Sequence, residues 1–376
     1  MRRAVSTIAV TAGCVGAVAL VLAFRDGPQA RGSVSTVAEV RHRLADRYYR
    51  AVPAWVLRQR SLGSLLAALG DPYTEYLTPA ELAALRRRQA GEYSGIGVTV
   101  TPQDNGLLVT STPPGPARKA GMRPGDTIVT IDGVPTAELT LEEAVASVIG
   151  AQGTRVALGA LRNGTPVAFT IVRTRVRTPP VRGYTMVQHG RKVAVLRVYR
   201  FADGTTAALR RAIASARRAG CDGFVLDLRN NPGGDLDQAV RVASLFLDHG
   251  VIARVGGRHE PWRTLEASGE PVAADDPLVV VVNRFSASAA EVVAAALREN
   301  DRAFVVGEQT FGKALVQEVE LLPGGGALKL TVARYVTPDG HDISVRGIVP
   351  DVYALDDPET LASEPLPAAI ALLRSR

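Results

Sequence analysis

Apolar side chains recur at helical intervals through residues 36–90, which predicts amphipathic helices there. Two such series are Val37, Val40, Leu44 and Tyr48, and then Leu62, Leu65, Leu66 and Leu69. The segment Asp71-Pro72-Tyr73 interrupts the pattern. Thr78-Pro79-Ala80-Glu81 restarts it with an N-cap residue, a proline at the first helical position and an early acid. We expect an N-terminal helical region over residues 36–92.

From Tyr93 the apolar runs become short and rich in β-branched residues. Turn signals such as Asp104-Asn105-Gly106 and Pro124-Gly125-Asp126 separate them. The expected strands are Ile96–Thr101, Leu107–Ser111, Thr127–Ile131, Val156–Leu161 and Val167–Val172, with short helices near Gly115–Ala120 and Leu141–Val148. This pattern predicts a compact β-rich domain over residues 93–176.

Residues 177–356 alternate strands of unbroken apolar residues with amphipathic helices. The strands are Val193–Val198, Gly223–Leu228, Leu278–Val282 and Ala303–Val306, and the helices are Thr205–Ala219, Leu236–Leu247 and Ser288–Glu299. Alternation of this kind predicts an α/β layer around a buried sheet. Residues 357–376 are expected to form a C-terminal tail or helix.

The N-terminus has an export pattern. Arg2 and Arg3 precede an uncharged run of 21 residues, Ala4 to Phe24, which as a helix would span about 30 Å, enough to cross a bilayer. The pattern also fits a cleaved signal peptide, with Ala17-Val18-Ala19 as the cleavage site, and less well a lipoprotein signal at Cys14. Residues 1–25 are therefore predicted as a signal peptide or membrane anchor and residues 26–35 as a linker. Each alternative makes the protein extracytoplasmic, either anchored by a single span or secreted.

Composition narrows the class of protein. With 376 residues, 46% hydrophobic and 22% charged, the chain has ordinary globular usage, which excludes a mainly disordered chain and a polytopic membrane protein. The net charge of +7 is spread along the sequence, so no nucleic-acid partner is expected. The two cysteines and five isolated histidines show no disulfide framework and no metal-ligand spacing. We expect no metal and no cofactor.

The basic residues are almost all arginine. Only four of the 44 are lysines, namely Lys119, Lys192, Lys313 and Lys329. A buried lysine can lose its proton, whereas arginine cannot. Lys313 stands in an uncharged run, Thr310 to Val316, which favours a neutral amine. Gln317 follows four residues later and is a candidate hydrogen-bond partner for that amine.

Lys313 also ends a short sequence that resembles a nucleotide-binding motif but does not match it fully. Gly307 to Lys313 reads GxxxxGK after a strand. A P-loop then requires Ser or Thr and a helix, whereas Ala314 follows here and Leu315–Leu322 partly alternates like a strand. Nucleotide binding is therefore the weaker interpretation.

Two strand-to-helix loops have features that acyl transfer uses. Ser288 is expected at a helix N-terminus, where the helix dipole favours a developing alkoxide. Because Ser288 and Glu291 also fit a capping box, that loop alone indicates little. In the other loop, Gly233 and Gly234 follow a proline, which lets backbone N–H groups face outward as an oxyanion hole requires. Alone, this loop also fits an ordinary tight connection.

Seven ordered motifs together resemble the carboxy-terminal processing proteases, which are Ser/Lys peptidases with an inserted PDZ domain. The motifs are Gly70-Asp71-Pro72-Tyr73-Thr74 with Tyr76; Tyr93-Ser94-Gly95-Ile96-Gly97; Arg123-Pro124-Gly125-Asp126; Asp227-Leu228-Arg229 with Asn231-Pro232-Gly233-Gly234; Ser286-Ala287-Ser288-Ala289-Ala290-Glu291; Val306-Gly307-Glu308 with Thr310-Phe311-Gly312-Lys313; and Gly347-Ile348-Val349-Pro350-Asp351. The resemblance spans residues 36–352. It implies a crotonase/ClpP-like α/β protease core over residues 177–356, a PDZ domain over residues 93–176 and an N-terminal helical segment.

The resemblance also implies roles for particular residues. Ser288 resembles the nucleophile, Lys313 the general base and Gln317 the residue that positions the lysine. The backbone amides of Ala289 and of Gly233 or Gly234 resemble the oxyanion hole. Ser94, Gly95, Ile96 and Gly97 resemble the loop that binds a peptide carboxylate.

Three details depart from the family pattern or conflict with it. Ala290 stands where many members have serine, a change expected to be harmless. Glu299 stands where many have aspartate, so its role is open. A hydrogen bond from Gln317 to Lys313 predicts a helical turn, because residues four apart lie about 13 Å apart on a strand but about 6 Å apart on a helix.

The function implied is that of an exported serine endopeptidase that cleaves protein substrates near their C-termini through an acyl-enzyme. Its PDZ domain would capture an apolar C-terminal tail as an added strand. The main alternative is a catalytically silent PDZ scaffold that binds protein C-termini, which the intact Ser288, Lys313 and Gln317 disfavour. An enzyme held inactive until a tail binds and a homo-oligomer both stay open. The expected partners are protein substrates and, through the N-terminal segment, a membrane.

Overall fold

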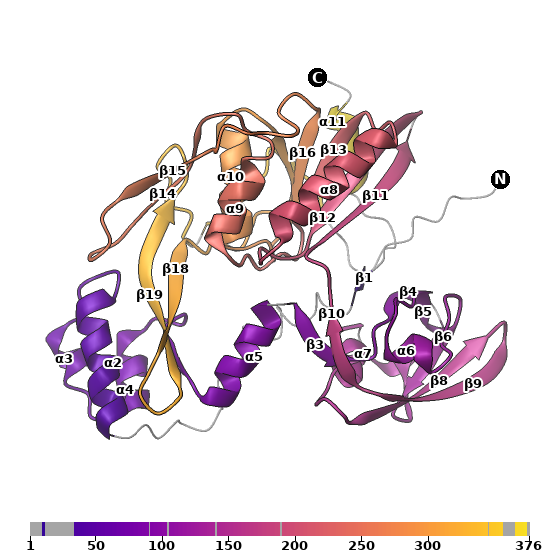
Figure 1. Ribbon diagram of the computed structural model, residues 1–376, viewed down its shortest axis with the longest axis horizontal. Helices are drawn as coiled ribbons and strands as arrows, with labels where there is room; N and C mark the ends of the chain where they lie inside the picture. The colour runs from indigo at the N-terminus through magenta and orange to yellow at the C-terminus, as the bar shows by residue number, and fades with distance from the viewer. Residues whose placement is uncertain are drawn as a thin grey trace. The chain divides into compact units, whose positions relative to one another are not determined.

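The computed structural model describes residues 10–11, 34–89, 91–103, 105–139, 141–188, 190–344, 346–355 and 365–373. The predicted signal peptide or anchor of residues 1–25 lies outside these ranges except for β1 (Val10–Thr11), and so does most of the predicted linker. Within the described residues, no helix has the length and apolar character to span a membrane. The chain divides into two compact units (Figure 1). One contains Arg87–Pro179, and the other contains the flanking Phe24–Arg86, Pro180–Asp356 and Glu364–Arg376.

The unit of residues 87–179 is built on antiparallel strands. Its seven-stranded sheet has the order β1-β4-β5-β6-β8-β9, with β7 paired to β6, and a second, two-stranded sheet joins β10 to β3. The elements are β3 (Glu92–Gly95), β4 (Thr99–Gln103), β5 (Gly106–Ser111), α6 (Pro116–Lys119), β6 (Thr127–Ile131), β7 (Val134–Pro135), η2 (Thr136–Glu138), α7 (Leu141–Val148), β8 (Arg155–Arg162), β9 (Thr165–Val172) and β10 (Thr174–Arg177). The alternating burial of Val156, Leu158 and Ala160 places their side chains in the core. The predicted strand Ile96–Thr101 begins later, because Gly97 adopts a left-handed conformation (φ 74°) that ends the extended backbone.

The second unit contains a six-stranded sheet of order β11-β12-β13-β16-β17-β20. Strands β12, β13, β16, β17 and β20 run parallel to one another, and β11 is an antiparallel edge. The strands are β11 (Val181–Gln188), β12 (Arg191–Val198), β13 (Gly223–Asp227), β16 (Leu278–Val282), β17 (Phe304–Gly307) and β20 (Val352–Tyr353); the helices are α8 (Thr205–Arg218), α9 (Leu236–Ala243), α10 (Ala289–Glu299) and α11 (Pro365–Leu372). The predicted α/β layer around a buried sheet is therefore present.

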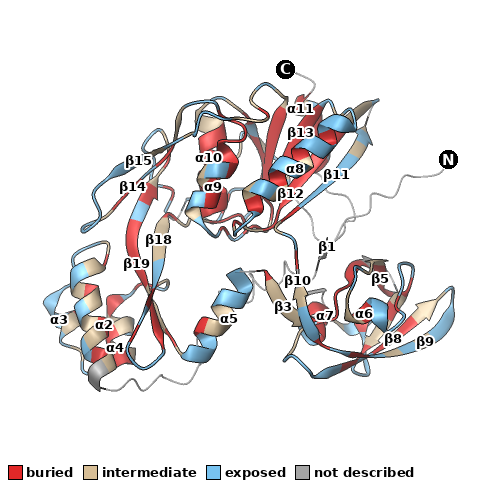
Figure 2. Cartoon of the chain, viewed as in Figure 1, coloured by how far each residue is buried: buried red, intermediate tan, exposed pale blue. Residues whose placement is uncertain are grey.

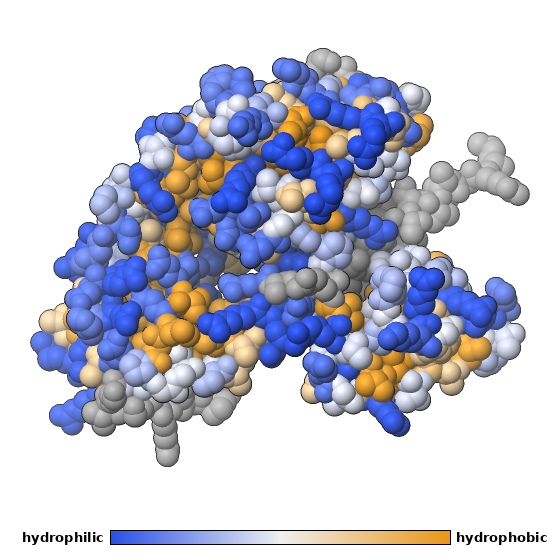
Figure 3. Space-filling view, in the orientation of Figure 1, coloured by the Kyte–Doolittle hydropathy of each residue, from blue (hydrophilic) through white to orange (hydrophobic). Residues whose placement is uncertain are grey.

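Alternate residues of this sheet face two different cores. Leu196, Leu226 and Val280 share one apolar cluster with the inner sides of α8, α9 and α10. Val195 and Val281 share another with α11. Figure 2 shows β13, β16 and most of α10 as buried. The outward side of α8, by contrast, is hydrophilic (Figure 3), because its arginines are exposed while Leu209 and Ile213 are buried.

The same unit includes a second sheet and the N-terminal helices. The second sheet has the order β15-β14-β19-β18, with β2 also paired to β19. Its strands are β2 (Glu75–Leu77), β14 (Val251–Gly256), β15 (Arg263–Glu266), β18 (Leu315–Leu321) and β19 (Ala327–Val336), and the helices are α2 (Val34–Arg47), α3 (Ala54–Leu57), α4 (Leu62–Leu69) and α5 (Pro79–Gln89). Val40, Leu44 and Leu65 of these helices belong to the same apolar cluster as β19. Arg47 also pairs with Glu320 of β18 (2.7 Å). The helices of residues 34–86 are thus part of the α/β unit rather than a separate body.

Candidate active site

Three loops meet at the carboxyl edge of the parallel sheet, where ligands of open α/β sheets bind. They follow β13, β16 and β17, and they carry Gly233, Ser288 and Lys313 respectively. Hydrogen bonds join the first two loops, because the Ser286 hydroxyl donates to the Leu228 carbonyl (2.8 Å). The amide of Phe311 donates to the Ser286 carbonyl (3.0 Å) and joins the third. The structure therefore brings together segments that lie far apart in the sequence.

Ser288 stands at the start of α10 in an unusual backbone conformation. Its φ of 55° is uncommon for a residue that has a side chain. The loop after β13 approaches it so closely that a Cβ on Gly233 would lie 2.8 Å from Ser288 Cβ and 2.9 Å from the Ala289 nitrogen. Strained, closely approached residues of this kind concentrate at functional sites.

The predicted oxyanion donors differ in availability. The Ala289 N–H is in the first turn of α10, where helical acceptors are lacking, and neither it nor the Gly234 N–H has an acceptor in the described chain. The Gly233 N–H, in contrast, donates to Asn231 Oδ1 (2.9 Å). Asn231 must therefore turn away before the Gly233 amide can bind an oxyanion.

The pKa of the Lys313 amine is lower than that of an ordinary lysine. The pKa of its amine is lowered from 10.5 to about 8, chiefly by burial and also by nearby Lys329, while Asp71, Glu291 and Glu75 oppose the change. The Nζ atom lies 4.8 Å from the centroid of the Tyr73 ring. Among the described residues, it makes no hydrogen bond to Ser288 or Gln317. The lowered pKa thus favours a role as a base, although the amine is not hydrogen-bonded to the serine.

The helical turn predicted around Gln317 is wrong. Leu315–Leu321 forms β18, paired with β19 along its length, and the register shifts between Val316 and Gln317. Pairing with β19 therefore makes this segment extended and leaves no helical turn. The Gln317 Nε2 atom is buried and has no partner in the described structure, which is rare for a polar group.

Glu291 is a site residue that the sequence pattern indicated only as a helix cap. Its carboxylate is fully buried and accepts hydrogen bonds from Thr310 Oγ1 (2.5 Å) and from the N–H groups of Ser288 (2.8 Å), Gly312 (2.8 Å) and Lys313 (2.9 Å). Burial raises the pKa of this carboxyl, and the hydrogen bonds oppose the rise. One side chain thus ties the serine loop to the lysine loop. In the sequence it was marked only by the capping-box spacing and by its place at the end of the Ser286–Glu291 motif.

Tyr335 of β19 makes a second tie between the same loops. Its hydroxyl hydrogen-bonds to the Lys313 carbonyl and lies 3.1 Å from the Ser288 carbonyl. Burial raises the pKa of this hydroxyl well above its ordinary value, so it keeps its proton and donates. No local pattern marks Tyr335, because its partners are distant in sequence.

The start of the glycine loop is held by a buried ion pair. Arg229 donates to both carboxylate oxygens of Asp227 (2.9 and 2.8 Å). Burial acts to raise the pKa of Asp227, yet the guanidinium groups of Arg229 and Arg197 bring it below its ordinary value. The pair therefore stays charged and fixes the loop that leads to Gly233.

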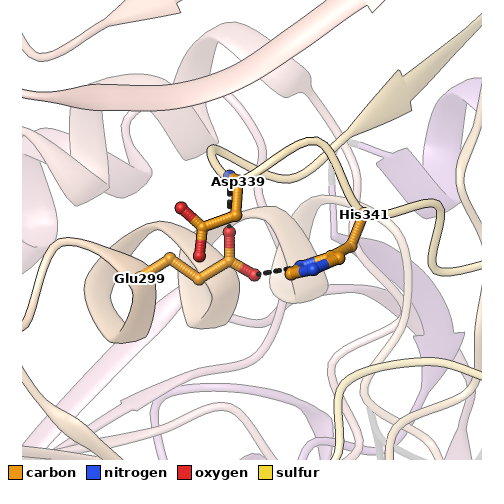
Figure 4. Close-up of side chains that lie close together, drawn as sticks. All are labelled: Glu299, Asp339 and His341. Carbon is orange, nitrogen blue, oxygen red and sulfur yellow. Dashed lines mark hydrogen bonds and ion pairs between the residues drawn. The ribbon is translucent and has the colours of Figure 1, made fainter.

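Glu299, whose role the resemblance left open, lies at the far end of α10 (Figure 4). Its carboxylate accepts the N–H of Asp339 (2.9 Å) and lies 3.5 Å from His341 Nδ1. The ligand atoms of these three residues lie within 4.8 Å of one another, but Asp339 and His341 are exposed. We assign Glu299 the structural role of holding the 337–341 turn onto α10.

The predicted carboxylate-binding loop lies in the other unit. Ser94 and Gly95 end β3 and pair with β10, and Ile96 and Gly97 follow. The Ser94 hydroxyl is buried and has no partner among the residues described. The four predicted residues thus run from the last two positions of β3 into the segment that follows it.

Two family models and several known proteins match this chain. Residues 192–354 match the model of peptidase family S41, and residues 109–162 match that of the PDZ domain. A carboxyl-terminal-processing protease of Picosynechococcus sp. is 38% identical over 323 residues, which is 81% of this chain and 78% of the relative. Its Synechocystis sp. counterpart is 39% identical over 297 residues, 77% of this chain and 69% of the relative. The solved structure of a photosystem II D1 C-terminal processing protease has a TM-score of 0.59 and 32% identity, covering 90% of this chain and 96% of its own.

Proposed function

The chain belongs to peptidase family S41, the carboxyl-terminal-processing serine proteases, and carries a PDZ domain; from this premise we propose that Ser288 and Lys313 form its catalytic dyad. The observation that carries the proposal is the double tie between the two residues through Glu291 and Tyr335. A dyad assembled from distant loops needs such fixed spacing, because small misplacements reduce rates strongly.

The chemistry proceeds in two acyl-transfer steps. Neutral Lys313 accepts the Ser288 hydroxyl proton while the serine oxygen bonds to the scissile carbonyl carbon. The resulting oxyanion is stabilised by the Ala289 N–H and by the glycine loop. The lysine ammonium then gives its proton to the leaving amine, the C–N bond breaks, and an acyl-enzyme remains. Water then gives a proton to the same amine and bonds to the acyl carbon, the bond from that carbon to the Ser288 oxygen breaks, and the lysine returns the proton to the serine oxygen.

One movement must precede this chemistry. A general base acts from about 2.6–3.2 Å, whereas no hydrogen bond joins Lys313 Nζ to Ser288 in the described structure. Rotation about the bonds of the flexible lysine side chain supplies the approach, and Gln317, with its unpartnered Nε2 and its amide oxygen, is the candidate to receive the amine. Catalytic hydrogen bonds often tighten only when substrate binds.

In this proposal the PDZ domain binds the C-terminal tail of the substrate. Ser94, Gly95, Ile96 and Gly97 would hold the terminal carboxylate, and the apolar tail would add as a strand. The protein is exported in this proposal, anchored or secreted through residues 1–25, which is supported by their arginine-led apolar pattern. Fractionation of expressing cells and mass spectrometry of the N-terminus test that part. Recovery of the intact chain only from the cytoplasm would contradict it.

The decisive experiment compares the parent with Ser288→Ala and Lys313→Ala on an unfolded protein that ends in an apolar tail. Ser215→Ala and Lys192→Ala, exposed or partly exposed on the α/β unit, are the matched controls. We expect cleavage by the parent and both controls only. Continued cleavage by Ser288→Ala would refute the nucleophile. Tail binding without cleavage by any variant, the parent included, would favour a PDZ scaffold.

A further inference from the structure

The amine of Lys313 faces an aromatic ring that comes from the N-terminal part of the chain. Its Nζ lies 4.8 Å from the ring centroid of Tyr73, in the turn between α4 and β2. That separation is within the range of cation–π contacts, in which the ring attracts an ammonium ion but not a neutral amine. Burial raises the pKa of the Tyr73 hydroxyl, so the ring stays uncharged while the lysine titrates.

Tyr73 is held in place by Asp71. The Asp71 carboxylate accepts hydrogen bonds from the Tyr73 N–H (2.9 Å), Thr74 Oγ1 (2.6 Å), Thr331 Oγ1 (2.7 Å) and Tyr48 OH (3.2 Å). Tyr48 follows α2, and Thr331 lies on β19 directly opposite Gln317. The ring is therefore fixed against the strand pair that follows Lys313.

The charged groups around Lys313 have opposing effects on the protonation of its amine. Burial and Lys329 favour the neutral amine, whereas Asp71, Glu291 and Glu75 favour the ammonium form. Glu75, however, is engaged by Lys329 at 2.9 Å, and Asp71 and Glu291 are occupied by the hydrogen bonds described above. None of these carboxylates makes an ion pair with Nζ in the described structure. The ring face is the group that contacts the charge directly.

We propose that Tyr73 is a positioning residue for the general base, whose ring stabilises the ammonium form of Lys313. The inference rests on the proposed role of Lys313. The ring strengthens the amine as a base, because the ammonium ion formed when Ser288 gives up its proton is partly stabilised by the π face. The N-terminal helices thereby contribute to the active site through the Asp71 turn.

The proposal can be tested by measuring the titration of Lys313 directly. Because the chain has only four lysines, labelling with ¹³Cε-lysine gives four NMR signals, and Lys313→Arg identifies the relevant one. In Tyr73→Leu we expect the Lys313 midpoint to fall by about half a unit to one unit. In Tyr73→Phe, which keeps the ring, it should stay at the parent value. The signals of Lys119 and Lys192 are internal controls, and the pH profile of kcat/KM should move in parallel with the Lys313 midpoint.

The Lys313 midpoint in the Tyr73 variants either supports or contradicts the proposed role of the ring. An unchanged Lys313 midpoint in folded Tyr73→Leu would show that the ring only packs, and an equal shift in Tyr73→Phe would assign the effect to the hydroxyl. Either result overturns the proposal. If Tyr73→Leu fails to fold, Tyr73→Met gives the same reading with an unbranched side chain. A shifted midpoint in a protein that cleaves nothing would uphold the contact while refuting the proposed protease chemistry, so the two failures are distinguishable.

Discussion

The carboxylate of Glu291 accepts the backbone N–H of Lys313 at 2.9 Å. It accepts the backbone N–H of Ser288 at 2.8 Å as well. The proposed nucleophile and base are thus fixed through their main chains, which leaves both side chains free to move. A lysine that must approach a serine, take its proton and later release it needs that freedom. The relative placement of the two loops is rigid, while the chemistry is carried by flexible groups.

Glu291→Gln should lower activity strongly without removing the side chain's volume. A glutamine has one acceptor oxygen, and its NH₂ group would face N–H donors that the carboxylate now accepts. Charge-assisted hydrogen bonds contribute about 1.5–3 kcal/mol each, so we expect the free energy of unfolding to fall by about 2–4 kcal/mol and kcat by about a hundredfold. Urea denaturation and peptide cleavage measure the two effects.

The control for this prediction lies on the same helix. Glu299→Gln changes the carboxylate that accepts the Asp339 N–H, away from Ser288, and should alter kcat less than about twofold. Parent-like activity and stability in Glu291→Gln would show that the tie between the two loops is unimportant.

Tyr335→Phe should loosen the second tie. The substitution removes a buried hydroxyl that hydrogen-bonds to the Lys313 carbonyl and lies 3.1 Å from the Ser288 carbonyl. We expect a loss of about 1–2 kcal/mol in the free energy of unfolding and a fall in kcat larger than the change in KM. Tyr353→Phe, at an exposed position, is the control and should behave as the parent does. Equal kinetics in the two variants would mean that the Tyr335 hydroxyl serves stability alone.

The sequence predicted the buried sheet of the α/β layer well because its strands are buried on both faces. Leu278–Val282 reads as five consecutive apolar residues, and it is fully buried in β16. The residues at the ends of these strands could also be identified, since Ser288 follows a buried strand and Lys313 stands in an uncharged run. Both patterns are local, so a single sequence shows them.

The remaining features depend on pairing between distant segments. The proposed hydrogen bond from Gln317 to Lys313 predicted a helical turn, whereas pairing with β19 makes the segment a strand. The contact of Tyr73 with Lys313 and the bridge from Tyr335 join residues that share no local pattern. The occupied Gly233 amide depends on the side-chain conformation of Asn231. Such relationships are set by tertiary packing, which periodicity does not encode.

The pKa of Lys313 predicts how activity depends on pH. Since the neutral amine is the base, kcat/KM should rise with pH and level off above about pH 8, the value to which burial lowers this pKa. A pH–rate profile with chemistry limiting measures this directly. A flat profile between pH 6 and pH 10, which spans the neutral and alkaline range, would exclude lysine as the base.

The same shift predicts how stability depends on pH. The folded protein releases the Lys313 proton near pH 8, but the unfolded chain keeps it to about 10.5. Between these values the unfolded state binds more protons, so this group's contribution to stability rises with pH. Below pH 8 the buried ammonium ion destabilises the fold by on the order of 3 kcal/mol. Lys313→Met should therefore exceed the parent in unfolding free energy at pH 7, with a smaller gap at pH 10. An equal gap at both pH values would contradict the lowered pKa.

Gly233→Ala should abolish activity through collision at the serine. An added Cβ would lie 2.8 Å from both Ser288 Cβ and the Ala287 carbonyl oxygen, and the glycine has a φ of 96°. The loop or Ser288 must shift, so we expect kcat to fall at least a hundredfold. Gly220→Ala is a matched control, because Gly220 also has a positive φ of 71° but nothing within 4 Å of the added Cβ. It should lose about 1 kcal/mol of stability from backbone strain and keep its activity. If both variants cleave equally well, the approach of the glycine loop to Ser288 has no part in catalysis.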